Sequence, residues 1–267
     1  MTRRRLYEKR MKERSVSLSP RLAYAAEQLR GANVVADIGC DHGRLAVALI
    51  QRQCCTRVIA VDSSAPSFLK AGRLIAYVGL SHAIETRLGD GFSAITPGAC
   101  DATALLGMGG ILITELLDAC SAPLNGAKRA VFQPMRGQEA LRRYLWEREY
   151  RITDDRIVRE GLRFYQVITV EPPEANYMFQ NTNLGKSQVC LTGIERQALP
   201  EGWPPDCFEL GFVSFAQRDP LLPELAQKLL AQYEKQLAGA RGSSGEAALA
   251  QKAERMRQII GACQIPS

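Results

Sequence analysis

The feature that most constrains this chain is a regular alternation of short apolar runs and helical segments within its first 150 residues. The apolar runs hold four to six residues each, and Gly, Pro, Ser or Asp residues bound them. Such alternation is typical of a parallel sheet that is covered by helices on both faces. We predict strands over residues 33–38, 57–61, 84–88, 102–106 and 129–132, and helices over residues 20–29, 44–53, 66–78, 110–119 and 138–147.

The pattern changes after residue 150. Residues 151–159 and 162–170 are strand-like, and Glu160-Gly161 between them is typical of a hairpin turn. Five parallel strands followed by an antiparallel hairpin resemble the seven-stranded sheet of class I methyltransferases, which use S-adenosylmethionine. We therefore expect an α/β, Rossmann-like sheet that is mostly parallel and ends in an antiparallel C-terminal hairpin.

The C-terminal part has a different composition. A segment rich in Pro, Gly, Asn and Gln is followed by two amphipathic stretches, residues 220–237 and 246–260, with a short polar segment between them. This order predicts a small helical hairpin. We divide the chain into residues 1–171, an S-adenosylmethionine-binding catalytic domain with a basic N-terminal arm, and residues 172–267, an irregular linker followed by a coiled-coil-like helical domain.

The sequence argues against a membrane, secreted or metal-binding protein. No stretch approaches about 18 consecutive apolar residues, and no apolar core follows the basic N-terminus. The eight cysteines are scattered without a C-x-x-C motif, and His42 and His82 are the two histidines. We therefore expect a cytoplasmic protein with reduced thiols and no metal, and we favour a monomer over a homodimer.

The turn after the first predicted strand carries an acidic residue where a dinucleotide site needs a glycine. A G-x-G-x-x-G fingerprint would fall on Gly39, Asp41 and Arg44. The Asp41 carboxylate would repel a pyrophosphate, but it suits the ammonium or the sulfonium of S-adenosylmethionine. Electrostatics therefore favour this methyl donor over NAD.

Further acids and glycines follow the next strands. Asp62 ends the second strand, where a carboxylate can accept hydrogen bonds from both ribose hydroxyls of an adenosine. Asp90 follows the third strand and can read an adenine edge, and residues 107–110 (GMGG) follow the fourth, where they face the reacting methyl in this sheet order. Each acid alone could be a helix cap or a turn residue, but acids at successive strand ends favour a ligand site.

Several motifs resemble those of the bacterial tRNA adenine-N1 methyltransferases that modify position 22 of the D-arm. The D-I-G-S-D-H-A-Y-L of that family corresponds to residues 37–45 (DIGCDHGRL), and its R-L-G-D-G-L to residues 87–92 (RLGDGF). The G-M-G-G motif is unchanged. Its L-S-x-R-L, Q-P-N and Tyr-Glu correspond to residues 18–22, 133–135 (QPM) and Tyr165-Gln166. Met135 and Gln166 stand where the family has polar or acidic groups, so they can alter the target pocket.

The resemblance implies an S-adenosylmethionine-dependent enzyme that methylates N1 of an adenine in tRNA by direct in-line transfer. The implied cofactor-binding residues are Asp37, Gly39, Cys40, Asp41, Asp62, Ser63, Asp90, Gly91 and Gly107. The implied catalytic residues are Asp41, His42, Gly107, Met108 and Gly109. Asp41 has two candidate roles, to stabilise the adenine as it becomes cationic or to bind the methionyl ammonium, and the sequence leaves both open.

Positive charge supplies the candidate RNA contacts. The net charge is +6, and it is concentrated in residues 1–14, with seven bases and two acids, and in residues 128–163, with ten bases and six acids. This distribution predicts two phosphate-contact zones, although a basic arm can also be a solvated tail. The predicted RNA-binding residues are Arg3, Arg4, Arg5, Lys9, Arg10, Lys12 and Arg142. Arg142 and Arg143 can instead form a solvated face with Glu139 and Glu147, which we favour for Arg143.

Three other functions remain open from the sequence alone. A class I methyltransferase acting on a small molecule or a protein would keep the cofactor site and make the basic arm incidental. A non-catalytic RNA-binding module would have a degenerate cofactor site. An NAD oxidoreductase would bind a nucleotide without needing Asp41.

Overall fold

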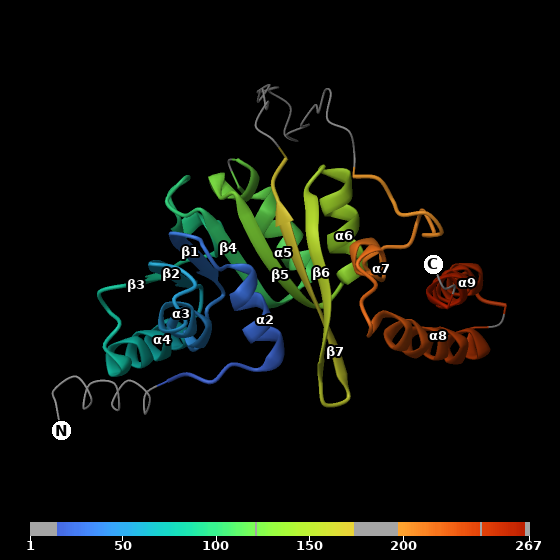
Figure 1. Cartoon of the computed structure of the whole chain (residues 1–267), viewed down its shortest axis with the longest axis horizontal. Helices are drawn as coiled ribbons and strands as arrows, with labels where there is room; N and C mark the ends of the chain where they lie inside the picture. The colour runs from blue at the N-terminus through green and yellow to red at the C-terminus, as the bar shows by residue number, and fades with distance from the viewer. Residues whose placement is uncertain (1–14, 121, 174–196, 241, 265–267) are drawn as a thin grey trace.

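A seven-stranded sheet organises the molecule (Figure 1). The computed structural model describes residues 15–120, 122–173, 197–240 and 242–264. The strand order is β3-β2-β1-β4-β5-β7-β6; the first five strands in the chain pair in parallel, and β7 lies antiparallel between β5 and β6. The strands are β1 (Val34–Ile38), β2 (Arg57–Asp62), β3 (Ile84–Leu88), β4 (Ala102–Gly109), β5 (Arg129–Arg136), β6 (Arg151–Glu160) and β7 (Arg163–Glu171). The predicted fold class is confirmed.

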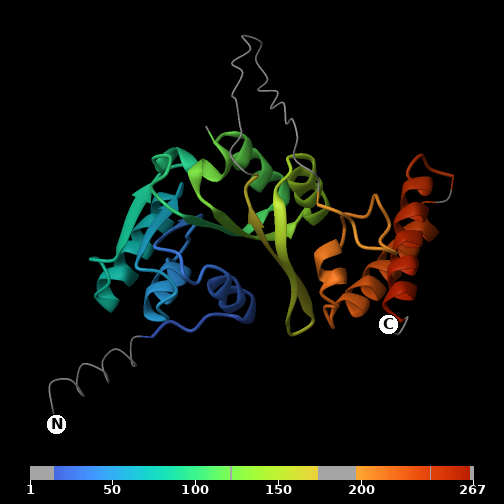
Figure 2. The same ribbon diagram turned by 45° about the horizontal axis from the view of Figure 1, so that its top comes forward.

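Helices cover both faces of this sheet, as Figure 2 shows. Side chains alternate along β1, so that Val35 belongs to the apolar core with α2, α3 and α4, whereas Ala36 and Ile38 belong to the core with α5 and α6. These elements are α2 (Pro20–Gln28), α3 (Arg44–Gln51), α4 (Ala65–Val78), α5 (Gly110–Asp118) and α6 (Gln138–Glu147), with the short 3-10 helices η1 (Gly91–Ala94) and η2 (Pro123–Gly126).

Three further helices lie beyond the β6 edge of the sheet: α7 (Phe212–Ala216), α8 (Leu222–Gly239) and α9 (Glu246–Cys263). The predicted helical hairpin is confirmed, since α8 and α9 pack against each other. The sequence did not predict α7, whose Phe212 joins the same apolar core as Met256 of α9 and Phe132 of β5. The domain division at residue 172 stays a prediction, because residues 174–196 lie outside the described part of the chain.

Arg142 corrects one prediction. Its side chain is fully buried on α6, where Nε and Nη2 donate to the two carboxylate oxygens of Asp155 at 2.7 and 2.9 Å. Nη1 donates to the backbone carbonyls of Phe208 and Glu209 at 3.2 Å each, and Nη2 also contacts the side-chain oxygen of Gln166. The expectation that Arg142 binds RNA is therefore wrong, because this guanidinium joins the sheet to the C-terminal part.

The neighbouring arginine behaves as predicted. Arg143 is 42% exposed in its side chain and pairs with Glu139 one turn earlier, at 3.5 Å. It therefore lies on the solvated face of α6 that the helical spacing indicated.

Candidate cofactor-binding and active site

The segments that follow β1, β2 and β3 are held together by backbone hydrogen bonds at one edge of the sheet. The amides of Gly39 and Cys40 donate to the carbonyl of Val61, at 2.8 and 2.9 Å. The amide of Gly89 donates to the carbonyl of Asp62 at 3.0 Å. The carboxyl edge of an open parallel sheet is where such folds bind ligands.

The turn after β1 needs its glycines. Gly39 and Gly43 have φ angles of 73° and 69°, in the left-handed region that L side chains rarely adopt. Asp41 is also left-handed, with φ of 48°, and its amide donates to Asp62 Oδ2 at 2.8 Å. A Cβ atom at Gly39 would lie 2.1 Å from the terminal methyl of Met108. The left-handed backbone therefore requires glycine at position 39, whereas the flexible end of the Met108 side chain could move away from a Cβ atom.

Asp37, near the end of β1, is a buried carboxyl group that is only partly satisfied. Its side chain is 3% exposed, and Oδ2 has no hydrogen-bond partner within the described residues. Burial raises the pKa of Asp37 to about 7; a hydrogen bond from the backbone of Ala46 opposes this rise, and the Asp62 carboxylate adds to it. A cation bound nearby would favour the ionised form of this group.

Asp41 and His42 point their side chains toward solvent. The Asp41 side chain is 68% exposed, and its Oδ2 lies 2.5 Å from His42 Nδ1. Its other oxygen accepts a hydrogen bond from the Ser67 hydroxyl of α4, at 3.4 Å. The carboxylate is therefore held by neighbours on two elements and remains accessible to a ligand.

The ends of β2 and β3 supply the other predicted contacts. Asp62 accepts backbone hydrogen bonds on both oxygens, from Asp41 and, at 2.9 Å, from Ser64. Each carboxylate oxygen accepts more than one bond, so Asp62 keeps capacity for two hydroxyls. Ser63 and Asp90 are exposed, and Gly91 is buried with φ of 53°.

The G-M-G-G segment lies differently from expectation. The sequence predicted that the fourth strand ends at residue 106, but β4 continues to Gly109 through an irregularity in its pairing with β5. Met108 is opposite Pro134 of β5, and Gly107 is exposed with φ of 78°. The bulge explains the longer strand, because it lets Gly107 leave the regular register without ending the pairing.

The charge of these turns fits a cationic adenosine derivative. Residues 37–43, 62–64, 89–91 and 107–109 contain four aspartates and no Lys or Arg. Arg44, which follows the first turn, donates to the backbone carbonyl of Ser17 at 2.6 Å. The partly satisfied Asp37 carboxyl and the glycine turn at Gly39 thus fit a group with ammonium and sulfonium charges and disfavour a pyrophosphate.

The structure also brings together motif residues that the sequence did not assign to the cofactor or catalytic site, among them Met135, which was expected to affect the target pocket. The Arg21 guanidinium of α2 lies 4.4 Å from the ring centroid of Tyr165 on β7, and its Nη1 is 3.2 Å from the sulfur of Met135. Gln133 Nε2 is 3.6 Å from the same sulfur, and Gln133 Oε1 is buried without a partner among the described residues. Because β5 pairs with β4 here, this cluster adjoins Met108.

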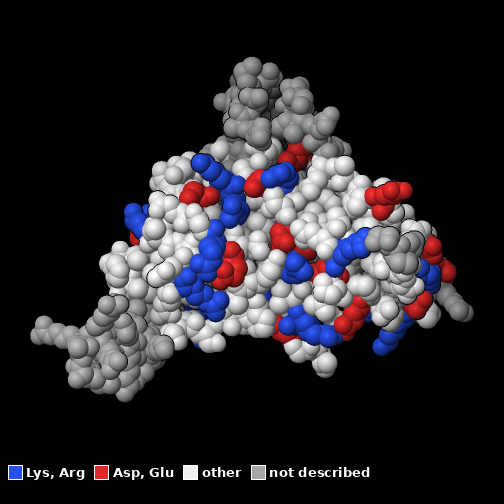
Figure 3. Space-filling model, in the orientation of Figure 1, with Lys and Arg blue, Asp and Glu red and all other residues white. Residues whose placement is uncertain are grey.

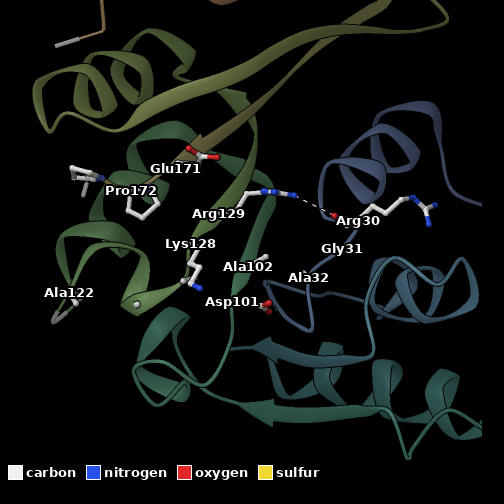
Figure 4. A pocket seen from close by; sticks show the side chains of 13 residues that line it. Arg30, Gly31, Ala32, Asp101, Ala102, Ala122, Lys128, Arg129, Glu171 and Pro172 are labelled. Carbon is white, nitrogen blue, oxygen red and sulfur yellow. Dashed lines mark hydrogen bonds between the residues drawn. The ribbon is translucent and has the colours of Figure 1, made fainter. Parts of the chain in front are cut away.

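A cavity of about 700 Å³ lies at the opposite, amino edge of the sheet (Figure 4). Its charged residues mostly bind the fold: Arg129 donates to the backbone carbonyls of Gln28 and Arg30, and Asp101 accepts the amides of Asn33 and Val34. None of the predicted site residues lines it.

Figure 3 shows a stripe of Lys and Arg side chains on the β1 and α2 side of the molecule.

The remaining predictions concern the basic N-terminal arm, metal binding and a membrane span. Arg3, Arg4, Arg5, Lys9, Arg10 and Lys12 lie outside the described residues. Within the described ranges, no group of three His, Cys, Asp or Glu side chains is placed to hold a metal ion. No described helix has both the length and the apolar character that a membrane span requires.

Comparison with known proteins defines the class first. The family described as "Methyltransferase domain" matches residues 18–168, so this chain carries a methyltransferase domain. The tRNA (adenine(22)-N(1))-methyltransferase of Bacillus subtilis (strain 168) is 32% identical over 174 residues, which cover 65% of this chain and 73% of that protein. The chain therefore belongs to the family of tRNA (adenine(22)-N(1))-methyltransferases, and the resemblance found in the sequence is confirmed.

Solved structures share the fold. A protein of the NADB-Rossmann superfamily from Streptococcus agalactiae superposes with a TM-score of 0.76 at 22% identity, over 92% of this chain and 98% of that one. TrmK of M. capricolum, in complex with the cofactor product S-adenosyl-homocysteine, superposes with a TM-score of 0.74 at 19% identity, over 92% and 99% of the two chains. The shared architecture thus extends into the C-terminal part.

Proposed function

We propose that this protein transfers a methyl group from S-adenosylmethionine to N1 of the adenine at position 22 of tRNA. The observation that carries the proposal is the acidic turn of residues 37–43, hydrogen-bonded to Asp62, in a chain that belongs to this methyltransferase family. The related protein from B. subtilis carries that activity in its name.

Asp62 and the first turn would hold the methyl donor. In this proposal Asp62 accepts the ribose hydroxyls, Asp37 lies beneath the positively charged portion, and Asp90 and Gly91 face the adenine. Ser63, Cys40, Gly39 and Gly107 border it. When bound, S-adenosylmethionine supplies an electrophilic methyl group on a sulfonium. The support is the chemistry of the residues: carboxylates for hydroxyls and cations, and a glycine where a Cβ atom would meet Met108.

The reaction needs positioning more than proton transfer. Adenine N1 carries an in-plane lone pair and is neutral at pH 7, so no base must first remove a proton. The Gly107–Gly109 segment and Met108 would border the target base, hold it in line with the methyl group and exclude water. The adenine becomes cationic as the N–C bond forms and the methyl–sulfur bond breaks, with the electron pair of that bond left on the sulfur, and a carboxylate close by favours this change.

Asp41, with His42 beside it, is the candidate for that electrostatic role. The Asp41 carboxylate is exposed and fixed by Ser67 and His42. Its alternative role is to bind the methionyl ammonium. The two roles differ in what a substitution changes, since the first affects the rate of transfer and the second affects donor affinity.

Access to N1 requires the RNA to open. N1 lies on the Watson–Crick edge, so the nucleotide must leave its stack before it can react. Phosphate contacts by Arg3, Arg4, Arg5, Lys9, Arg10 and Lys12 would supply much of the affinity. Deletion of residues 1–14 should weaken tRNA binding and reduce its salt dependence, whereas unchanged turnover of a small substrate would indicate an incidental arm.

The direct test is incubation of the full chain with unmodified tRNA and isotopically labelled S-adenosylmethionine, followed by mass spectrometry of the nucleosides. We expect labelled 1-methyladenosine, located at position 22 by analysis of RNA fragments. Label in another nucleoside would overturn the assigned target. Absence of donor binding in calorimetry up to millimolar concentration would overturn the enzymatic proposal.

The cellular context follows from this substrate. We place the protein in the cytoplasm as a monomer that uses no metal. The cysteines of the described residues are free thiols, and burial raises the pKa of most of them. Gel filtration with light scattering tests the oligomeric state, and the mass of a dimer would contradict the proposed monomer.

A further inference from the structure

A second cavity, of about 310 Å³, lies where the C-terminal helices meet the sheet. The start of α6, the middle of β7 and the α8 helix form its walls. None of the residues proposed for the methyl donor or for the transfer lines it. The side chains used below are Gln138, Phe164, Gln166, Glu209, Gln232 and Tyr233.

This cavity adjoins the segment that faces the reacting methyl in our proposal. Gly137, which lines the cavity, packs so closely on Gly110 that a Cβ atom at Gly110 would lie 2.1 Å from the Gly137 carbonyl oxygen. Gln138 Nε2 donates to the carbonyl of Pro134 at 3.2 Å, next to Gln133 and Met135. A ligand in the cavity is therefore close to a base that reacts beside Met108.

The walls of the cavity suit a nucleobase better than a phosphate. Three glutamine side chains line it, and a carboxamide carries a donor and an acceptor in one plane, as a base edge does. Gln138 Nε2 donates to Pro134 and Gln166 Oε1 accepts from Arg142, so these two offer their other carboxamide atom to a base. Phe164 and Tyr233 add aromatic surface of the kind on which unpaired bases stack. Lys228, the cation among the lining residues, donates to the carbonyl of Leu162 at 3.0 Å and lies 5.2 Å from the Phe164 ring centroid.

Two polar groups of the cavity wall have capacity left for a ligand. Glu209 is 6% exposed; its Oε1 accepts a hydrogen bond from Arg255 at 2.5 Å, while Oε2 has no partner within the described residues. A base amino group supplies the donor that such an oxygen lacks. Tyr233 also lines the cavity, and its phenol is a hydrogen-bond donor; burial raises its pKa to about 12.

We propose that this cavity binds one unpaired base of the tRNA, adjacent to the adenosine that is methylated. The inference rests on the proposed function. When the target nucleotide leaves its stack, a neighbouring base loses its stacking partner, and Phe164 and Tyr233 replace that partner. Glu209 and the glutamines then contact the edge of the base. The helix α8 thereby takes part in substrate recognition.

A cycle of RNA and protein changes tests this proposal. Unmodified tRNA is prepared intact and with the base removed at the nucleotide before or after position 22. Methyl transfer to each RNA is measured with the full chain and with Phe164→Leu, Gln232→Ala and Gln236→Ala. Gln236 lies one turn after Gln232 on α8, is exposed and does not line the cavity, so it is the matched control.

We expect removal of one of the two neighbouring bases to raise KM about tenfold for the unchanged chain and for Gln236→Ala, because a stacked base contributes a factor of roughly 5 to 150 in affinity. The same removal should raise KM less than about threefold for Phe164→Leu, since the base no longer has its ring partner. Gln232→Ala should reduce the effect in the same direction and is a surface change that leaves the fold intact.

The outcomes separate the two proposals. If the unchanged chain methylates intact tRNA at position 22 but base removal has equal effects in all four proteins, the cavity proposal is overturned and the proposed function stands. If intact tRNA receives no methyl group, the proposed function itself fails. Calorimetry with S-adenosylmethionine should give equal donor affinity for all four proteins.

Discussion

Two regions of the sheet bury an aspartate, and the two carboxylates differ in how completely they are hydrogen-bonded. At the junction with the C-terminal part, Asp155 is 1% exposed and receives both arms of the Arg142 guanidinium. At the end of β1, Asp37 is 3% exposed, has a backbone hydrogen bond and keeps one oxygen without a described partner. A buried carboxylate with a complete set of partners holds the fold, whereas an incomplete set is typical of a site that a ligand completes.

The largest effect is expected at the junction. Arg142→Ala should lower the free energy of unfolding by about 3–5 kcal/mol, because it leaves the Asp155 charge buried without its partner. Urea denaturation monitored by circular dichroism measures this change. The control is Arg143→Ala on the exposed face of the same helix, which should change the free energy by less than about 0.5 kcal/mol. Equal losses in both variants would contradict the comparison.

The acidic turn should respond in activity instead of stability. Asp41→Ala should slow methyl transfer about 100-fold at saturating donor, because the carboxylate no longer favours the developing positive charge. Single-turnover measurements on tRNA report this rate. The free energy of unfolding should fall by no more than about 1 kcal/mol, because the side chain is largely exposed and the remaining cost is that of an alanine in a left-handed conformation. A rate that recovers fully at high donor concentration would assign Asp41 to ammonium binding.

The next effect concerns donor affinity. Asp62→Ala should raise the dissociation constant for S-adenosylmethionine about 30-fold, roughly 2 kcal/mol, because the ribose hydroxyls lose a charged acceptor. Calorimetry measures this constant. Asp62→Asn is the matched control for the turn, since its side-chain oxygen can still accept the Asp41 amide. If Asp62→Ala binds the donor as tightly as the unchanged chain does, Asp62 does not contact the ribose.

The smallest predicted effect is a pH dependence. Because the pKa of Asp37 is raised to about 7, the group is mostly protonated at pH 6 and mostly ionised at pH 8. A cationic donor binds the ionised form better, so its affinity should rise about tenfold from pH 6 to pH 8. Isothermal titrations across this range should show the slope in the unchanged chain, and Asp37→Asn should remove it.

The free energy of unfolding should fall as the pH rises, whereas donor affinity should increase. The folded chain keeps the Asp37 proton up to about pH 7, whereas the unfolded chain releases it near the ordinary value for an aspartate, about 4. Asp37 therefore contributes stability that is full at low pH and is lost as the pH rises to about 7. In the absence of donor, we compare the free energy of unfolding of Asp37→Asn with that of the unchanged chain. The difference, variant minus unchanged chain, should be larger at pH 8 than at pH 5. A constant difference would show that Asp37 does not titrate in this range.

The sequence predicted the parts of this molecule that depend on local pattern. The short apolar strands and their flanking helices were found within a few residues, because strand burial and helical period are visible in a single stretch of chain. The turn of residues 37–43 was identified because glycine and aspartate follow a buried strand directly. The residues of the proposed donor site can therefore be predicted from the sequence.

Contacts between distant segments were not predictable in the same way. Arg142 looked like a surface base because its partner, Asp155, lies on the next strand and carries no pairing signal in the sequence. The cluster of Arg21, Met135 and Tyr165 joins three elements that the chain separates widely. The irregularity that extends β4 to Gly109 also depends on its partner strand.

The position of β7 between β5 and β6 has a consequence for synthesis of the chain. Until residues 163–171 have left the ribosome, one side of β5 has no partner, and its amides and carbonyls are available to any extended segment. A chain that stops before the hairpin would leave an apolar strand edge open to self-association. Closure of the nascent sheet therefore awaits the last strand to be made, and truncations near residue 150 should aggregate.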